Sequence, residues 1–188
     1  MKKIILFDFF GVISSEVGPF WFRRYVSEEI ADETKARIVS PGDKGEISER
    51  EMFQQMGAHV GVSAERARRE WLELARIDRD IVEYIRKLKE NHRVYLLSNA
   101  TSGFLRDIIK RDGLEPLFDG IFISAEIKIA KPSEEYFRYC LGKIGAKAEE
   151  CIFTDDNPKN VDAARAVGIS AHRYEGLAGL RDFIERNI

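Results

Sequence analysis

The sequence is poor in cysteine, in long apolar stretches and in excess charge. Its 188 residues include only two cysteines, Cys140 and Cys151, without the paired spacing or the nearby histidine pair of a zinc site. We therefore expect two reduced, buried thiols. No stretch approaches the roughly 18 apolar residues of a membrane span, so no membrane partner is expected. Lysine and arginine (30) nearly balance aspartate and glutamate (32), which provides no electrostatic field for binding nucleic acid.

The start of the chain is similar to a signal peptide only superficially. Met1, Lys2 and Lys3 precede an apolar run, but Asp8 interrupts that run after a few residues. We therefore expect a first β-strand and a cytoplasmic protein. With 44% hydrophobic and 33% charged residues, the composition is typical of one globular unit, or of a core with a modest insertion.

Short apolar runs alternate with helical segments along most of the chain. The spacing of Ile81, Ile85 and Leu88 is typical of the helices between these runs. Such alternation predicts an α/β fold with a doubly wound parallel sheet. The expected buried strands are residues 4–7, 94–97, 121–123, 151–153 and 171–174.

One interval breaks the alternation, because a long helical region, residues 14–80, separates the first two strands. Apolar stripes around Trp21, Phe53 and Trp71 predict a small helical bundle there. We interpret residues 14–80 as an inserted α-helical cap on a core made of residues 1–13 and 81–188. Residues 40–45 are expected to form a loop that divides the cap and that could face a site on the core. Ser48 followed by Glu51 predicts a capping box at the start of the next helix.

Polar residues follow four of the five predicted strands, where ligands bind in open α/β sheets. Asp8 ends the first strand, Ser98 and Asn99 the second and the Asp155–Asp156 pair the fourth, while Lys131 follows the third. Each has an ordinary structural explanation when taken alone, such as a helix cap or a surface lysine. Together they place an acid, a hydroxyl, a cation and a metal ligand on one edge, which favours a site. Adjacent buried carboxylates favour Mg²⁺ as their counter-ion.

These segments resemble the four motifs of the haloacid dehalogenase superfamily, at residues 8–12, 98–99, 131–132 and 155–160. Residues 152–164 are similar to the branch with paired aspartates in the fourth motif, a subfamily IA-like branch, and residues 44–48 look like that branch's cap. The resemblance spans essentially the whole chain. It implies a Rossmann-like core with strand order 5-4-1-2-3 and a type 1 helical cap inserted after the first motif.

The resemblance also implies an activity, that of a Mg²⁺-dependent hydrolase acting as a phosphatase on a small phosphorylated metabolite. Asp8 would attack phosphorus to form an aspartyl-phosphate, which water then hydrolyses. Ser98 and Lys131 would act with it as catalytic residues on the phosphoryl oxygens. The further residues that the resemblance assigns are the metal ligands Asp8, Phe10 (through its carbonyl) and Asp156, the supporting Asp155 and Asn160, and the substrate-binding Phe9, Phe10, Gly11, Asn99 and Lys44.

Phe10 departs from the family pattern. Most phosphatases of this superfamily carry a second aspartate two residues after the nucleophile, which protonates the leaving oxygen and then activates water. Phenylalanine can do neither, and losing such a group removes roughly 10²–10⁴-fold from a rate. The carbonyl of Phe10 can still hold the metal, so the metal site does not depend on the missing carboxylate.

Three interpretations of Phe10 stay open. The favoured one is a phosphatase that uses a cap residue or water as the acid, or esters with good leaving groups. The second is a haloacid dehalogenase-type hydrolase, since those enzymes have an aromatic residue at this position, although they typically lack an acidic pair such as Asp155 and Asp156. The third is a regulatory protein that binds metal and phosphate without turnover. A phosphonate-cleaving variant with Lys44 as a Schiff-base lysine is more remote, and the substrate and the oligomeric state stay open.

Overall fold

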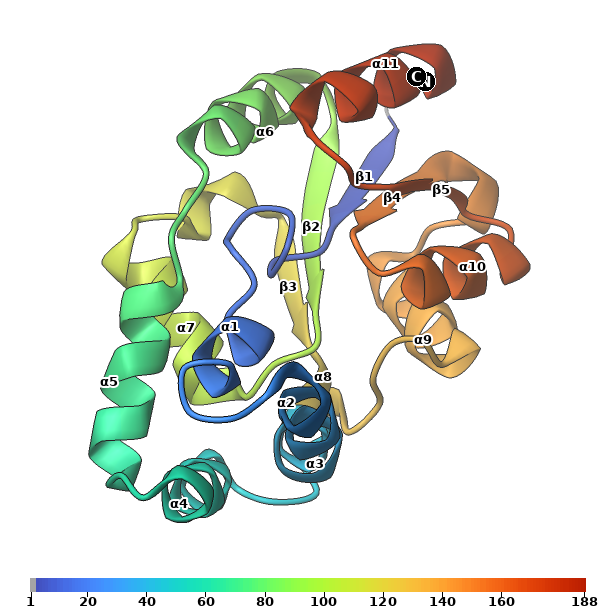
Figure 1. Cartoon of the computed structure of the whole chain (residues 1–188). Coiled ribbons are helices and arrows are strands. Elements are labelled where there is room, and N and C mark those ends of the chain that lie inside the picture. The colour runs from blue at the N-terminus through green and yellow to red at the C-terminus, as the bar shows by residue number, and fades with distance from the viewer. Residues whose placement is uncertain (1–2) are drawn as a thin grey trace.

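The computed structural model describes residues 3–188 and contains one five-stranded sheet (Figure 1). Residues 1 and 2, with which the predicted core segment 1–13 begins, lie outside the described residues. Neighbouring strands are parallel in the order β3-β2-β1-β4-β5, which confirms the predicted fold class and the predicted order, read from the opposite edge. The strands are β1 (Ile4–Phe7), β2 (Arg93–Ser98), β3 (Gly120–Ile123), β4 (Cys151–Asp155) and β5 (Ser170–Arg173).

Helices cover both faces of the sheet, as in a doubly wound fold. One group of helices, residues 18–74, lies between β1 and α6 in the chain and is called the inserted helices below. It comprises α1 (Gly18–Phe22), α2 (Glu28–Thr34), the π-helix η1 (Lys35–Val39), α3 (Ser40–Asp43), α4 (Glu49–Val60) and α5 (Ala64–Leu74). The others are α6 (Arg79–Asn91), α7 (Ser102–Arg111), the 3₁₀-helix η2 (Glu115–Leu117), α8 (Ser124–Ile127), α9 (Glu134–Ile144), the 3₁₀-helix η3 (Ala148–Glu150), α10 (Pro158–Ala166) and α11 (Leu177–Asn187).

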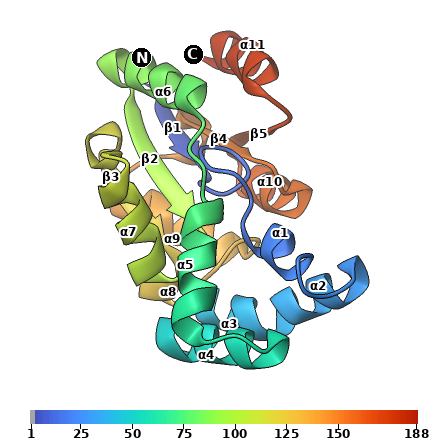
Figure 2. The ribbon, with the colours of Figure 1, turned by 60° about the vertical axis from the view of Figure 1, so that its left-hand side comes forward.

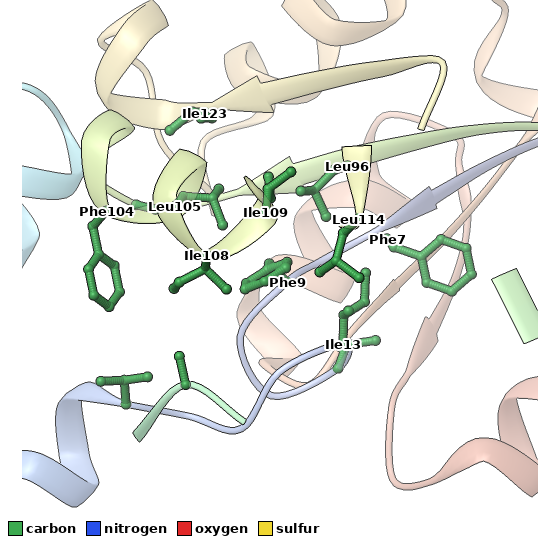
Figure 3. Packing of buried hydrophobic residues seen from close by; sticks show 14 of the residues in the cluster. Phe7, Phe9, Ile13, Leu96, Phe104, Leu105, Ile108, Ile109, Leu114 and Ile123 are labelled. Atoms are coloured by element: carbon green, nitrogen blue, oxygen red, sulfur yellow. The ribbon is translucent and has the colours of Figure 1, made fainter. Parts of the chain in front are cut away.

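The side chains of β1 alternate between two cores. Ile5 and Phe7 pack with buried residues of α6, α7 and α11, whereas Ile4 and Leu6 pack with those of α9 and α10. This alternation is the two-residue period of a strand that is buried on both faces. Figure 3 shows the first core, in which Phe9 lies beside Ile108. The turn after β1 is therefore anchored by its own apolar side chain.

The inserted helices lie beyond the carboxyl ends of the strands (Figures 1 and 2). Trp21, Phe53 and Trp71 are buried, and Trp71 packs on Phe104 of α7 with ring centroids 5.6 Å apart. The insertion therefore shares its apolar core with the sheet domain. The exact division at residues 14 and 80 stays a proposal.

The segment predicted as a loop at residues 40–45 is largely helical, so that part of the prediction is wrong. The chain winds through η1 directly into α3, and Pro41 is the second residue of α3. The predicted capping box is confirmed. The Ser48 hydroxyl accepts a hydrogen bond from the Glu51 amide at 3.2 Å, and the Glu51 carboxylate accepts one from the Ser48 amide at 2.8 Å.

A carboxylate of the insertion caps a helix of the core. Glu49 Oε2 accepts hydrogen bonds from Thr101 Oγ1 at 2.9 Å and from the Phe104 amide at 2.7 Å, while Oε1 accepts one from Arg68 Nε at 2.9 Å. No cap for α7 comes from the side chain of Thr101, its own N-cap residue. A side chain at Gly103 would put its Cβ 2.8 Å from Glu49 Oε2. Glu49 thus supplies what the first turn of α7 lacks.

Both cysteines are buried free thiols, as expected. Burial is the first cause that raises the pKa of Cys140 and of Cys151 to about 12, so neither carries a thiolate near neutral pH. Among the helices of residues 3–188, none combines the length and the hydropathy that crossing a bilayer requires.

Candidate active site

Three carboxylates and one lysine meet at the carboxyl ends of β1 and β4. Asp8 follows β1, Asp155 is the last residue of β4, and Asp156 comes next. One oxygen of each carboxylate lies within 4.8 Å of the others. Lys131, from the segment between α8 and α9, reaches the same point. These four residues are called the rim below.

The Lys131 ammonium group is fully buried and has three partners. Its Nζ lies 2.6 Å from Asp155 Oδ2, 2.8 Å from Asp8 Oδ1 and 2.8 Å from the carbonyl oxygen of Leu97. An ammonium group has three N–H donors, so none remains to be satisfied. Burial by itself lowers the pKa of Lys131, but the charges of Asp155 and Asp8 outweigh it and the pKa is raised. Lys131 therefore keeps its charge inside the protein.

Asparagine side chains hold the rim in place. Asn99 Nδ2 donates to the Lys131 carbonyl at 2.8 Å, and the Lys131 amide donates back to Asn99 Oδ1 at 2.9 Å. This reciprocal pair ties the lysine segment to the end of β2. Below Asp8, Asp155 accepts hydrogen bonds from Asn160 Nδ2 at 3.0 Å to each oxygen and from the Asn157 amide at 2.9 Å. Asp155 is thus occupied by protein donors and acts as a support.

Asp8 has one restrained oxygen and one free oxygen. Oδ1 accepts a hydrogen bond from the Phe9 amide at 2.7 Å and pairs with Lys131. Within residues 3–188, Oδ2 receives no hydrogen bond. Burial first, and Asp155 second, raise the pKa of Asp8 well above its ordinary value, while Lys131 acts in the opposite direction. A further positive charge nearby would favour the ionised form that a nucleophile needs.

The charge balance of the rim fits a divalent cation. Three carboxylates face one ammonium group, which leaves two negative charges uncompensated. Burial, Glu16 and Asp155 raise the pKa of Asp156 to about 6, as expected for a carboxylate without a counter-ion. An ion of two positive charges with a preference for oxygen ligands, such as Mg²⁺, would neutralise the excess.

The turn after β1 completes an oxygen-lined position for such an ion. Three amides, of Val12, Ile13 and Ser14, converge on the carbonyl of Phe9, and within residues 3–188 the carbonyl of Phe10 accepts no hydrogen bond. Gly11 has a φ of +82°, and a Cβ there would lie 2.4 Å from Asp156 Oδ2. Only glycine therefore allows this turn beside Asp156.

A cavity of about 270 Å³ opens above the rim. The aromatic ring of Phe10 forms part of its wall and stacks on Phe104, with centroids 6.1 Å apart and planes at 19°. Met52 and Trp71 of the inserted helices also face it. The cavity thus has a charged floor and an apolar stretch of wall. Six of the site residues predicted from sequence line this cavity, namely Asp8, Phe10, Asn99, Lys131, Asp156 and Asn160.

The other predicted site residues do not line this cavity. Ser98 is buried at the end of β2, where its hydroxyl has no hydrogen-bond partner within residues 3–188, and Phe9 lies in the apolar core. Gly11 lies beside Asp156, and Asp155 is the rim residue that does not line the cavity. The Lys44 side chain is 52% exposed, with Nζ 4.0 Å from Glu46 Oε1. The structure therefore brings together the rim but not Lys44.

Three charged residues that the sequence analysis missed complete the cavity. Glu16, Lys35 and Asp43 also line it and are called the roof below. Lys35 Nζ lies 3.6 Å from Glu16 Oε2. Of these three residues, only Asp43 could have been found from sequence, because it lies in the segment 40–45 that was expected to face the core. The residue predicted from that segment was its neighbour Lys44.

Comparison with known proteins places the chain in a family. The profile of haloacid dehalogenase-like hydrolases matches residues 2–168. A sesquiterpene phosphatase from Aspergillus oryzae is 27% identical over 94% of this chain and 92% of its own. A D-ribitol-5-phosphate phosphatase from Bacteroides thetaiotaomicron is 25% identical over 96% of each chain.

Solved structures agree with this assignment. A haloacid dehalogenase family enzyme from Bacteroides thetaiotaomicron superposes with a TM-score of 0.82 at 25% identity, covering 97% of this chain and 98% of its own. A structure of that wild-type enzyme in complex with magnesium and inorganic phosphate has a TM-score of 0.78 at 25% identity, covering 93% of this chain and 95% of its own.

Proposed function

The chain belongs to the haloacid dehalogenase-like hydrolases, and from that premise we propose that it is a Mg²⁺-dependent phosphatase acting on a small phosphorylated metabolite. The observation that carries this proposal is the state of Asp8. One of its oxygens is held by Lys131 and the Phe9 amide, and the other is free beside a cavity. That arrangement suits a nucleophile for phosphorus.

Each residue of the rim has a different role in the proposed reaction. Asp8 Oδ2 attacks phosphorus, and the bond from phosphorus to the leaving oxygen breaks as the aspartyl-phosphate forms. Lys131 holds Asp8 and supplies positive charge at the phosphoryl oxygens, with the unpaired hydroxyl of Ser98 as a further donor. Mg²⁺ held by Asp8, the Phe10 carbonyl and Asp156 would screen the repulsion between an anionic nucleophile and an anionic substrate. Asp155 and Asn160 keep Lys131 in position.

The relatives support this reaction class and this ion. Both relatives compared above carry the name of a phosphatase, and a family enzyme from Bacteroides thetaiotaomicron was crystallised with magnesium and inorganic phosphate. Their named substrates differ, one a sesquiterpene and one a sugar alcohol phosphate. The cavity of about 270 Å³ suits a small leaving group, and the rings of Phe10, Trp71 and Phe104 favour one with an apolar part.

A haloacid dehalogenase activity is less compatible with the rim. A substrate carboxylate placed near Asp8 would face Asp156, whose charge repels it. A regulatory protein without turnover is the other alternative, and it differs from the phosphatase only in the hydrolysis step.

The test measures phosphate release from a panel of phosphate monoesters, and halide release from L-2-haloacids, with Mg²⁺ and with EDTA. We expect Mg²⁺-dependent phosphate release that Asp8→Asn abolishes, together with a covalent phosphoryl group on acid-quenched wild-type protein. Asp182→Asn, an exposed aspartate on α11, is the matched control and should retain full activity. Halide release in EDTA, or Mg²⁺-dependent phosphate binding without any turnover, would overturn the proposal in favour of the corresponding alternative.

A further inference from the structure

Phe10 leaves the proposed reaction without a proton donor beside Asp8. The alkoxide that leaves phosphorus must gain a proton, and the water that attacks the aspartyl-phosphate must lose one. Lys131 cannot serve, because its three N–H groups are already engaged in the buried rim. The donor must therefore come from elsewhere in the cavity wall.

Asp43 is the roof residue whose carboxyl group is not engaged. Within residues 3–188, neither of its oxygens takes part in a hydrogen bond or an ion pair, whereas Lys35 and Glu16 pair with each other at 3.6 Å. Asp43 lines the same cavity as Asp8 but does not belong to the cluster of rim carboxylates. A substrate that reaches Asp8 would lie in the cavity that both residues line.

The backbone of Asp43 is tied to the end of β2 through one hydroxyl. Ser124 Oγ donates to the Asp43 carbonyl and accepts a hydrogen bond from the Ala100 amide at 3.0 Å. Ala100 directly follows Asn99, which holds Lys131. On the other side, Gly45 has a φ of +66° and a Cβ there would lie 2.5 Å from the Ala125 carbonyl. The end of α3 is thus fixed relative to the rim.

The surroundings of Asp43 favour its protonated form up to about neutral pH. Burial, with a smaller contribution from Glu16, raises its pKa to about 7, and Lys35 of η1 acts in the opposite direction. The charged groups on the other neighbouring elements are engaged elsewhere. Glu49 of α4 binds Thr101, Phe104 and Arg68, and Glu126 of α8 pairs with Arg106 at 2.8 Å.

We propose that Asp43 is the general acid and base of this enzyme, supplied by the inserted helices in place of a carboxylate at residue 10. As Asp8 bonds to phosphorus and the ester bond breaks, the Asp43 carboxyl gives its proton to the leaving oxygen, which departs as an alcohol. The resulting carboxylate then takes a proton from the attacking water. Inorganic phosphate leaves, and Asp8 and protonated Asp43 are restored. This inference rests on the proposed phosphatase function.

The test uses two substrates that differ in their need for an acid. An alkyl phosphate leaves as a strongly basic alkoxide, whereas dinitrophenyl phosphate leaves as a stable anion. We expect Asp43→Asn to lower kcat/KM for the alkyl ester by roughly 10²–10⁴-fold and to change the dinitrophenyl ester only several-fold. Asp182→Asn, which alters an exposed carboxylate of α11, should leave both esters unchanged.

The pH profile gives a second readout. For the alkyl ester, wild-type kcat/KM should fall as pH rises through about 7, because Asp43 loses the proton that it must donate. Asp43→Asn should lack this limb of the profile, measured on the same ester. Phe10→Asp in the Asp43→Asn background should recover part of the alkyl ester activity, since it returns a carboxyl group beside Asp8.

The outcomes separate the two proposals. Wild type that turns over neither ester with Mg²⁺ overturns the phosphatase function itself. Wild type that is active, with Asp43→Asn affecting both esters equally or neither, overturns the role of Asp43 alone. If Asp43→Asn does not fold, Ser124→Ala takes its place, because it removes the hydroxyl that positions Asp43 and leaves the carboxyl intact. Ser124→Ala should then lower kcat/KM less than is expected of Asp43→Asn, and only for the alkyl ester. An equal loss of kcat/KM on both esters would overturn the role of Asp43.

Discussion

The rim and the roof face the same cavity but are built in different ways. On the rim, Lys131 has three partners and Asp155 is bound by Lys131, Asn160 and the Asn157 amide. On the roof, Lys35 and Glu16 share one ion pair of 3.6 Å between partly exposed side chains, and Asp43 has no such partner within residues 3–188. A saturated network holds one geometry. The rim thus suits a fixed reaction step, and the roof suits a proton donor that must change its partner.

The largest effect expected from this contrast concerns the two lysines of the cavity. Lys131→Met leaves Asp8 and Asp155 as buried carboxylates without their cation, and we expect it to lower the free energy of unfolding by about 3–5 kcal/mol. Lys35→Met breaks only a partly exposed pair and should cost less than about 1 kcal/mol. Urea denaturation of both variants measures the difference. Equal losses would mean that rim and roof are not distinct.

A smaller effect is expected where the insertion meets the core. Glu49→Ala removes the acceptor of the Phe104 amide and of Thr101, and should lower the free energy of unfolding by about 1–3 kcal/mol. Hydrogen exchange should speed up at the first turn of α7. Glu73→Ala, on the exposed surface of α5, is the matched control. If both variants behave alike, the cap formed by Glu49 contributes nothing to stability.

A third effect concerns the dependence of stability on pH. Asp43 has a pKa of about 7 in the folded protein and 3.8 as its ordinary value, so its ionisation is disfavoured by folding. Wild type therefore loses stability from this group as pH rises from about 4 through about 7. Asparagine does not ionise. The melting temperature of Asp43→Asn, taken relative to wild type, should therefore be higher at pH about 8 than at pH about 5. The difference should be roughly 2–4 °C for each kcal/mol of unfolding free energy that wild type loses between these two pH values.

Calorimetry at the two pH values checks the sign of this shift. Asp182→Asn should give the same difference from wild type at both, because its side chain is exposed. A relative melting temperature of Asp43→Asn that falls with rising pH would contradict the assignment of a raised pKa.

The three carboxylates of the rim could be predicted from sequence because they stand at the ends of apolar strands, whereas Lys131 lies between α8 and α9 and was predicted from its motif with Pro132. The end of a buried strand is visible as a change from apolar to polar residues, as at Phe7 and Asp8, and parallel strands bring such ends together. The five strands are found within two residues of their predicted ends. The roles of the individual rim residues remain predictions that await the variants described above.

The roof could not be predicted in the same way. Its position depends on how η1 and α3 pack against α4 and α8, and helix periodicity alone does not give such contacts between distant segments. Ser124 and Asp43, whose hydrogen bond positions the roof, are 81 residues apart. The segment around Asp43 was also expected to be a loop, because Pro41 and Gly42 are typical of turns, and its winding through η1 has no clear sequence signature.

The cap that Glu49 places on α7 has a consequence for how this protein can change over evolutionary time. An insertion that completed its own structure could be exchanged for another without regard to the core. Here the first turn of the core helix contains one amide, that of Phe104, whose acceptor within residues 3–188 is a carboxylate of the insertion. The absence of a side chain at Gly103 leaves space for that carboxylate. A transplanted insertion must therefore bring a hydrogen-bond acceptor to the same point. Otherwise the first turn of α7 in the recipient core keeps an amide without an acceptor.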